Sequence, residues 1–233
     1  WIMKFGSITT GIIADGLIFN MDPANRASYP RTGIVISDVI GNTTSGSITN
    51  DPTFSEDIAF NFDGVDQYID IIPNFSITNS STTSIWYKNT SGGSPSGYRN
   101  LLGGIGIGQY GFTITSGGWR TYTAGSPTWE PMSDSNVTDG DWHNLTGVYD
   151  SVALTWTSYV DGQFYKTFNA NTNSGTKFGY QNYSATSYYN MGTYSNAAQR
   201  FTLGSIGIVY AYNRVLSANE VLHNYNALKG RFE

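Results

Sequence analysis

Apolar and polar residues alternate over short runs through most of the chain, and this two-residue period is typical of half-buried β-strands. The clearest runs are Leu145–Tyr149, Leu154–Val160 and Phe164–Phe168. Asp161-Gly162 separates the last two runs. This pair is a strong signal for a two-residue hairpin turn, because both central positions of that turn need a positive φ angle. The pattern predicts sheets built from many short antiparallel strands.

A helical period is clear at one place, near the end of the chain. Ser217 to Glu220 has the sequence of a capping box, which satisfies backbone N–H groups at a helix start. The apolar positions that fall on one face of the predicted helix are Val221, Leu222, Tyr225 and Leu228. Gly230 is placed to end the helix. We therefore expect one short helix at about 217–228 after about a dozen strands.

These elements predict an all-β protein, a two-sheet antiparallel sandwich with one short C-terminal helix. The 233 residues show no internal repeat or linker, so we expect a single domain over residues 1–233. A chain of this length buries most of its apolar surface without disulfide bonds. Aromatic residues make up 15% of the chain and charged residues 12%, which suits strands with neutral polar outer faces and argues against disorder.

Charge and composition exclude several classes of partner. The net charge is −5 and the 12 Lys and Arg residues form no cluster, so we expect no nucleic-acid partner. No apolar run approaches the roughly 20 residues that span a bilayer, so we expect no membrane insertion. The chain has no Cys, which excludes thiolate zinc sites and thiol nucleophiles.

Three motifs in order resemble the laminin-G-like group of the concanavalin-A-like jelly rolls. They are Phe62–Tyr68 (FDGVDQY), Trp142–Asp150 (WHNLTGVYD) and Tyr159–Gly162 (YVDG). The segment Tyr212–Glu220 is similar to the closing strand and helix of the same group. The resemblance covers nearly the whole chain and implies a jelly-roll sandwich of the lectin and glucanase type.

Two further segments resemble a subgroup common in virion proteins of tailed phages. They are Gly16–Pro30 (GLIFNMDPANRASYP) and Asn226–Phe232 (NALKGRF). The resemblance implies a non-enzymatic decoration or fibre protein at the virion surface or outside the cell. Its partners would be other virion proteins or copies of itself, together with cell-surface glycans. Secreted bacterial proteins share the module, so a secreted carbohydrate-binding module is the alternative, and a divergent glycoside hydrolase is a third hypothesis.

The sequence lacks the signals of catalysis. Glucanases of the superfamily carry E-x-D-x-x-E on one strand, whose alternation points the carboxylates into one groove. None of the four Glu residues of this chain forms that motif, so we expect no catalytic residues. His143, beside Trp142 at a strand start, is more simply explained by local packing and hydrogen bonding than by a role as base or ligand. His223 lies in the predicted helix.

A structural calcium ion stays open at this stage. The resemblance implies one ion held by turn carboxylates and backbone carbonyls, and Asp63, Asp66 or Asp150 could supply such oxygen ligands here. The ordinary roles of Asp in turns and at strand ends explain the same residues, and we prefer that interpretation. We therefore expect no other cofactor.

Two segments rich in Gly, Ser, Asn and aromatic residues, 116–135 and 180–194, are candidate sugar-binding loops. A pyranose ring packs its face on an aromatic ring while its hydroxyls bond polar groups. The candidate ligand-binding residues are Trp119, Arg120, Tyr122, Trp129, Tyr183 and Tyr188. We expect both tryptophans to be exposed. The alternative is that these rings fill the core or a subunit interface.

Overall fold

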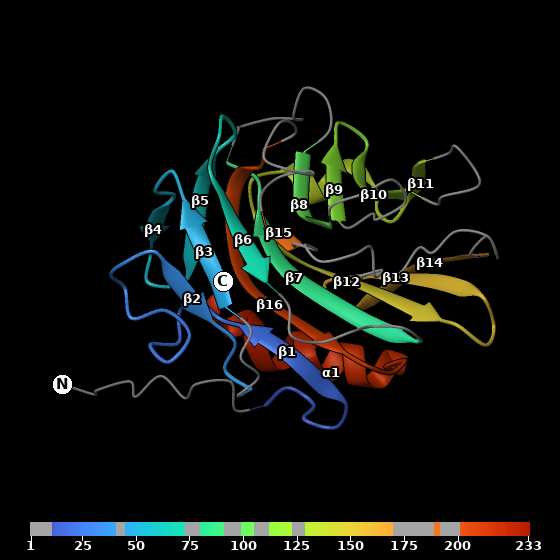
Figure 1. Ribbon diagram of the computed structural model, residues 1–233. Coiled ribbons are helices and arrows are strands. Elements are labelled where there is room, and N and C mark those ends of the chain that lie inside the picture. The colour runs from blue at the N-terminus through green and yellow to red at the C-terminus, as the bar shows by residue number, and fades with distance from the viewer. Residues whose placement is uncertain are drawn as a thin grey trace, which may run out of the picture.

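The computed structural model describes residues 11–40, 45–72, 80–90, 99–104, 112–122, 129–169, 189–191 and 201–233. Two antiparallel sheets face one another (Figure 1). In spatial order the first sheet consists of β14 (Gln163–Asn169), β13 (Thr155–Val160), β12 (Trp142–Asp150), β7 (Ser81–Lys88), β16 (Leu203–Tyr212), β5 (Ala59–Asp63) and β4 (Thr53–Ser55), with β1 (Leu17–Met21) paired to β16. The second sheet consists of β11 (Trp129–Pro131), β10 (Gly118–Tyr122), β9 (Phe112–Thr115), β8 (Arg99–Gly104), β15 (Tyr189–Met191), β6 (Tyr68–Ile72), β3 (Ser45–Thr49) and β2 (Val35–Ser37).

One α-helix, α1 (Ala218–Leu228), and two short 3-10 turns, η1 (Ser135–Thr138) and η2 (Lys229–Arg231), complete the described elements. The predicted two-sheet antiparallel sandwich with one C-terminal helix is confirmed. Among the described residues, no helix is both long enough and apolar enough to cross a bilayer.

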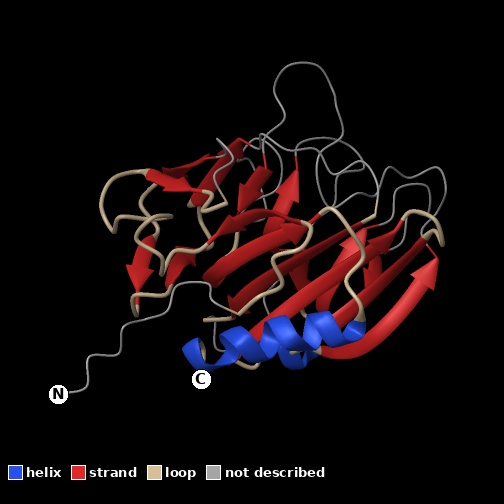
Figure 2. Cartoon of the chain, turned by 90° about the horizontal axis from the view of Figure 1, so that it is seen from below, coloured by secondary structure: helices blue, strands red, loops and turns tan. Residues whose placement is uncertain are grey.

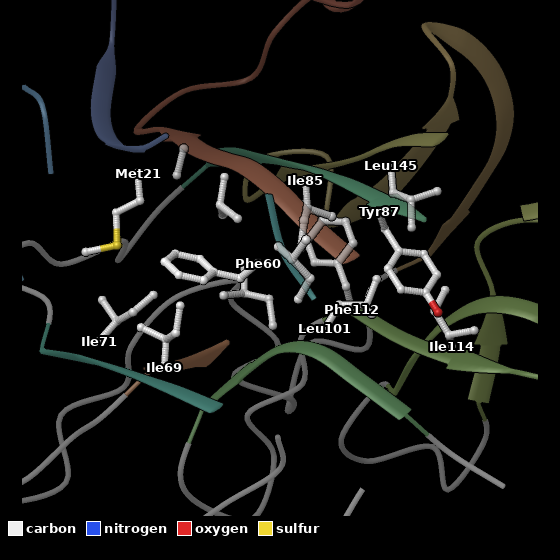
Figure 3. Close-up of a cluster of buried hydrophobic side chains, with 14 of the residues drawn as sticks. Met21, Phe60, Ile69, Ile71, Ile85, Tyr87, Leu101, Phe112, Ile114 and Leu145 are labelled. Atoms are coloured by element: carbon white, nitrogen blue, oxygen red, sulfur yellow. The ribbon is translucent and has the colours of Figure 1, made fainter. Parts of the chain in front are cut away.

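The main core lies between the two sheets, because strand alternation turns every second side chain inward. Figure 3 shows Phe60, Ile85 and Leu145 of the first sheet facing Ile69 and Leu101 of the second. All five side chains are buried. Burying one such side chain contributes about 1.5–3 kcal/mol, so this layer is the main stabilising feature of the fold.

A second apolar cluster lies on the outer face of the first sheet, where α1 covers it (Figure 2). Val221 and Leu228 of the helix pack there against sheet residues such as Trp86 and Tyr212. No other α-helix occurs in the described part of the chain, so this face of the first sheet is the one that a helix covers.

The predicted helix start is confirmed. The Ser217 side chain accepts a hydrogen bond from the Glu220 backbone N–H, and the Glu220 carboxylate accepts one from the Ser217 N–H at 2.8 Å. Glu220 also pairs with Arg214 at 2.6 Å, and this ion pair, with the bonds from Ser217, lowers the pKa of Glu220 to about 2. The helix ends at Leu228 and continues into η2, so Gly230 lies inside a 3-10 turn and does not end the helix as expected.

The turn prediction is also confirmed. Asp161 and Gly162 have φ angles of 51° and 74°, as the hairpin between β13 and β14 requires. Strand β8 has a register shift between Asn100 and Leu102 where it pairs with β9.

Candidate binding site

The prediction that Trp119 is an exposed sugar platform is wrong. Trp119 lies on β10 with 0% of its side chain exposed and stacks on Phe112, with ring centres 4.6 Å apart and planes 7° from parallel. Segment 116–135 contains the paired strands β10 and β11 and reaches the first residue of η1, so it is not one long loop. Trp119 pairs with Ile114 on β9, which is buried in the core. Residues directly opposite each other on paired strands point to the same side of the sheet, so the Trp119 side chain also points into the core.

The other candidate ligand residues are distributed differently. Arg120, next to Trp119 on β10, is partly exposed, and its Nε donates to Thr115 Oγ1 at 3.3 Å. Positions 122 and 129 are paired across β10 and β11, but their side chains lie outside the described ones. Tyr183 and Tyr188 lie outside the described residues. Of the six candidates, the structure therefore places Arg120 at the surface.

A polar and aromatic corner forms beside Arg120, where the edges of the two sheets meet. Tyr165 of β14, on the first sheet, donates its hydroxyl proton to Asp134 Oδ1 at 2.8 Å. Asp134 is exposed and follows β11 of the second sheet. The pKa of Tyr165 is raised, first by this hydrogen bond and then by burial, while the positive charge of nearby Arg120 acts in the opposite direction. We call Arg120, Asp134 and Tyr165 the edge site.

A tight turn between β9 and β10 holds the second-sheet side of the edge site. The Arg120 guanidinium lies over Gly117, and the Asp134 carbonyl lies against Gly118. A Cβ atom at Gly118 would be 2.0 Å from that carbonyl oxygen, and the φ angle of Gly118 is 96°. Only glycine fits this position, so the turn sequence fixes how closely Asp134 approaches β10.

Sequence reasoning missed Tyr165 and Asp134. Tyr165 sits at a β-bulge, because Lys166 pairs with Ser158 while Phe164 pairs with Tyr159, which leaves no β13 partner for the residue between. A bulge re-aims the side chain of its extra residue. The aromatic and polar residues of this hairpin can be read from the sequence. They alternate as in a regular strand, so the sequence gives no sign of the bulge at Tyr165.

His143 has the local, hydrogen-bonded role that the sequence indicates. The Nδ1 atom is 2.8 Å from Asp161 Oδ2, and the Nε2 atom is 3.1 Å from Asp139 Oδ1. Burial lowers the pKa of His143, but the hydrogen bonds and charges of Asp161 and Asp139 outweigh it, so the pKa is raised. The residue thus ties the turn before β12 to the hairpin that follows β13. His223, on α1, hydrogen-bonds the backbone carbonyl of Gly11.

The three candidate calcium ligands do not form one site. Asp63 Oδ1 accepts the Val65 N–H at 2.9 Å in its own turn, which also contains Asp66. Asp150 Oδ1 accepts the Val152 N–H at 2.8 Å in another turn. By strand register these turns lie toward opposite ends of β7, whose eight residues span roughly 25 Å.

The preferred turn interpretation of these aspartates is therefore confirmed for Asp63 and Asp150. Among the described residues, no three His, Cys, Asp or Glu side chains gather in a group that could hold a metal ion. These residues do not fit one calcium ion between them.

The paired sheets, the helix and the motif turns define a lectin-like β-sandwich. A family model described as the concanavalin A-like lectin/glucanases superfamily (Laminin_G_3) matches residues 63–222, more than half of the chain. The chain belongs to this family. No sequence among the curated proteins matches it.

Solved structures of binding domains and of an enzyme are similar to this chain. The binding domain of botulinum neurotoxin serotype D matches with a TM-score of 0.67 and 12% identity, over 91% of this chain and 52% of that one. The binding domain of botulinum neurotoxin DC, solved in complex with rat synaptotagmin II, matches with a TM-score of 0.64 and 14% identity, over 92% and 52%. Trypanosoma rangeli sialidase matches with a TM-score of 0.66 and 17% identity, over 94% and 34%. At these identities the likeness shows the fold, and the chain spans about half of each neurotoxin domain and a third of the sialidase.

Proposed function

We propose that this chain is a recognition domain that binds glycans without hydrolysing them. The observation that carries this proposal is how the described carboxylates are used. Hydrolysis of a glycosidic bond requires two carboxyl groups that face one groove, about 5–9.5 Å apart. Six of the described carboxylates are held by turns, a helix cap, ion pairs or His143. The residues held in this way are Asp22, Asp63, Asp139, Asp150, Asp161 and Glu220.

Asp70 of β6 is the carboxylate that most resembles a catalytic acid, since partial burial raises its pKa. Its strand neighbours at the same register are Ser47 of β3 and Asn190 of β15. Neither neighbour supplies the second carboxylate that hydrolysis needs. This arrangement favours recognition over the glycoside hydrolase hypothesis.

The family and the similar structures support a recognition role. The family is named for lectins as well as glucanases, and two of the similar structures are binding domains by name. The complex with rat synaptotagmin II favours a protein receptor as the second candidate partner.

The proposed biological setting is the surface of a tailed-phage particle, with other virion proteins or copies of the chain as neighbours. This placement rests on the resemblance of residues 16–30 and 226–232 to virion proteins. Mass spectrometry of purified native particles tests it. Recovery of the chain from culture medium as part of a secreted protein, and not with particles, would favour the secreted carbohydrate-binding module.

Two measurements on the pure protein test the proposed activity. The protein should bind members of a glycan array, and it should release no reducing ends from β-glucans, agars and alginates. Asp70→Asn is the matched variant for the second assay. Release by the parent that Asp70→Asn abolishes would overturn the non-hydrolytic proposal, and an array without any bound glycan would overturn glycan recognition.

A further inference from the structure

The corner where the sheet edges meet carries the most specific unassigned chemistry among the described residues. We propose that the edge site, formed by Arg120, Asp134 and Tyr165, binds a neutral hexopyranose. One face of the sugar packs on the Tyr165 ring, and adjacent hydroxyls bond the Asp134 carboxylate and the Arg120 guanidinium. This inference rests on the proposed glycan recognition and adds the place and the class of ligand.

The bulge is the first reason to regard the edge site as built for a ligand. Phe164 and Lys166 pair regularly with β13, whereas Tyr165 has no partner there. Its hydroxyl instead bonds Asp134, 31 residues earlier in the chain, between β11 of the second sheet and η1. Figure 1 shows β14 on the same side of the molecule as β10 and β11. Bulges are over-represented beside functional sites, where they re-aim one side chain.

The second reason is that the site is held in place before a ligand arrives. The hydrogen bond of Tyr165 to Asp134 fixes the ring, and the close approach of the Asp134 backbone carbonyl to Gly118 holds Asp134 against β10. Arg120 is held by its bond to Thr115. Restraining the contact groups in advance lowers the entropy lost on binding, which is how a small site gains affinity.

The chemistry of the three side chains selects a neutral ligand. One carboxylate and one guanidinium cancel in charge, and the raised pKa of Tyr165 keeps its phenol neutral. A carboxylate can accept about four hydrogen bonds, so Asp134 can take sugar hydroxyls besides Tyr165. An acidic sugar gains no net attraction from this pair, because repulsion by the Asp134 carboxylate offsets attraction to the Arg120 guanidinium. A hexopyranose offers both an apolar face for the ring and the hydroxyls that these groups bond.

The test measures binding of methyl hexopyranosides, methyl glucuronide and sialic acid by saturation-transfer NMR, and of array glycans by affinity. Tyr165→Phe keeps the ring and removes the hydroxyl, and we expect affinity for neutral sugars to fall about three- to tenfold. Tyr165→Ala and Asp134→Asn should each weaken binding about tenfold or more. Phe164→Ala is the matched control, because Phe164 is the adjacent exposed aromatic residue and packs near Tyr159 on the helix side. It should stay within about twofold of the parent.

Each outcome separates this inference from the proposed function. Neutral-sugar binding that Tyr165→Ala and Asp134→Asn weaken, and Phe164→Ala does not, supports both. Glycan binding that neither edge-site variant changes, or a preference for glucuronide or sialic acid, overturns the edge site as a neutral-sugar site and leaves glycan recognition standing. Absence of binding to every sugar and array glycan overturns both.

Discussion

The ion pair between Asp22 and Arg231 gives a sharp test of how the C-terminal end is held. Arg231 Nη1 and Nη2 donate to the two Asp22 carboxylate oxygens at 2.9 and 2.7 Å, a bidentate contact. The Asp22 side chain is 2% exposed and the Arg231 side chain 25%. Removing one partner of a buried pair costs about 3–5 kcal/mol, because a charge stays buried without compensation.

We expect Arg231→Gln to lower the free energy of unfolding by about 2–3 kcal/mol, below that range because Arg231 is partly solvated. For a chain of this length this corresponds to a fall in Tm of about 5–10 °C. Thermal and denaturant unfolding measure both quantities. Asp15→Asn is the control, because Asp15 pairs with Arg214 while 87% exposed. It should change stability by less than about 0.5 kcal/mol.

A double-mutant cycle isolates the ion pair from other losses. The Arg231 guanidinium also lies 5.3 Å from the centre of the Phe232 ring, so the single variant loses two interactions. The double variant Asp22→Asn with Arg231→Gln leaves no buried charge and should be more stable than the sum of the single effects by at least about 1 kcal/mol. Strictly additive effects, or an Arg231→Gln variant within about 0.5 kcal/mol of the parent, would refute the reasoning.

Two further predictions concern the hairpin between β13 and β14. Gly162→Val should destabilise the fold by about 2 kcal/mol, because it forces a β-branched residue to positive φ, and its Cβ would lie 3.0 Å from Tyr225 Cβ on α1; an unchanged Tm would reject this. The pKa of His143 is raised above its ordinary value of 6.5 by Asp161 and Asp139. The stabilisation that protonated His143 gains from these two carboxylates is therefore complete below pH 6.5, and it is lost as the pH rises through the raised pKa. Unfolding free energy measured from mildly acidic to alkaline pH should therefore fall less steeply in His143→Gln than in the parent, and parallel curves would contradict the assignment.

Local signals explain why the sandwich could be predicted from sequence. The Asp161-Gly162 pair specifies its turn through backbone angles, and Ser217 with Glu220 specifies the helix start through bonds within four residues. Neither signal depends on distant partners. The expected end near residue 228 is also correct, but Gly230 does not cause it, because the chain tightens into η2 without a left-handed residue.

Trp119 shows where such local reasoning fails. The Gly, Ser and Pro content of its segment indicates a loop, yet Ser116 and Gly117 form a narrow turn between the paired strands β9 and β10. The face of a strand residue depends on register, and a shift by one residue reverses it. Trp119 points inward because it pairs with Ile114, and this pairing cannot be read from the segment itself.

The position of Tyr165 follows from a conflict between the two apolar clusters that its strand serves. Phe164 packs near Tyr159, which belongs to the cluster under α1, whereas Phe168 packs against the core between the sheets. Residues four apart on a regular strand face the same side, so both contacts cannot form without one extra residue. The bulge at Tyr165 supplies that residue. Packing on both faces of the first sheet therefore directs Tyr165 to the sheet edge, and stability and the proposed ligand site depend on the same irregularity.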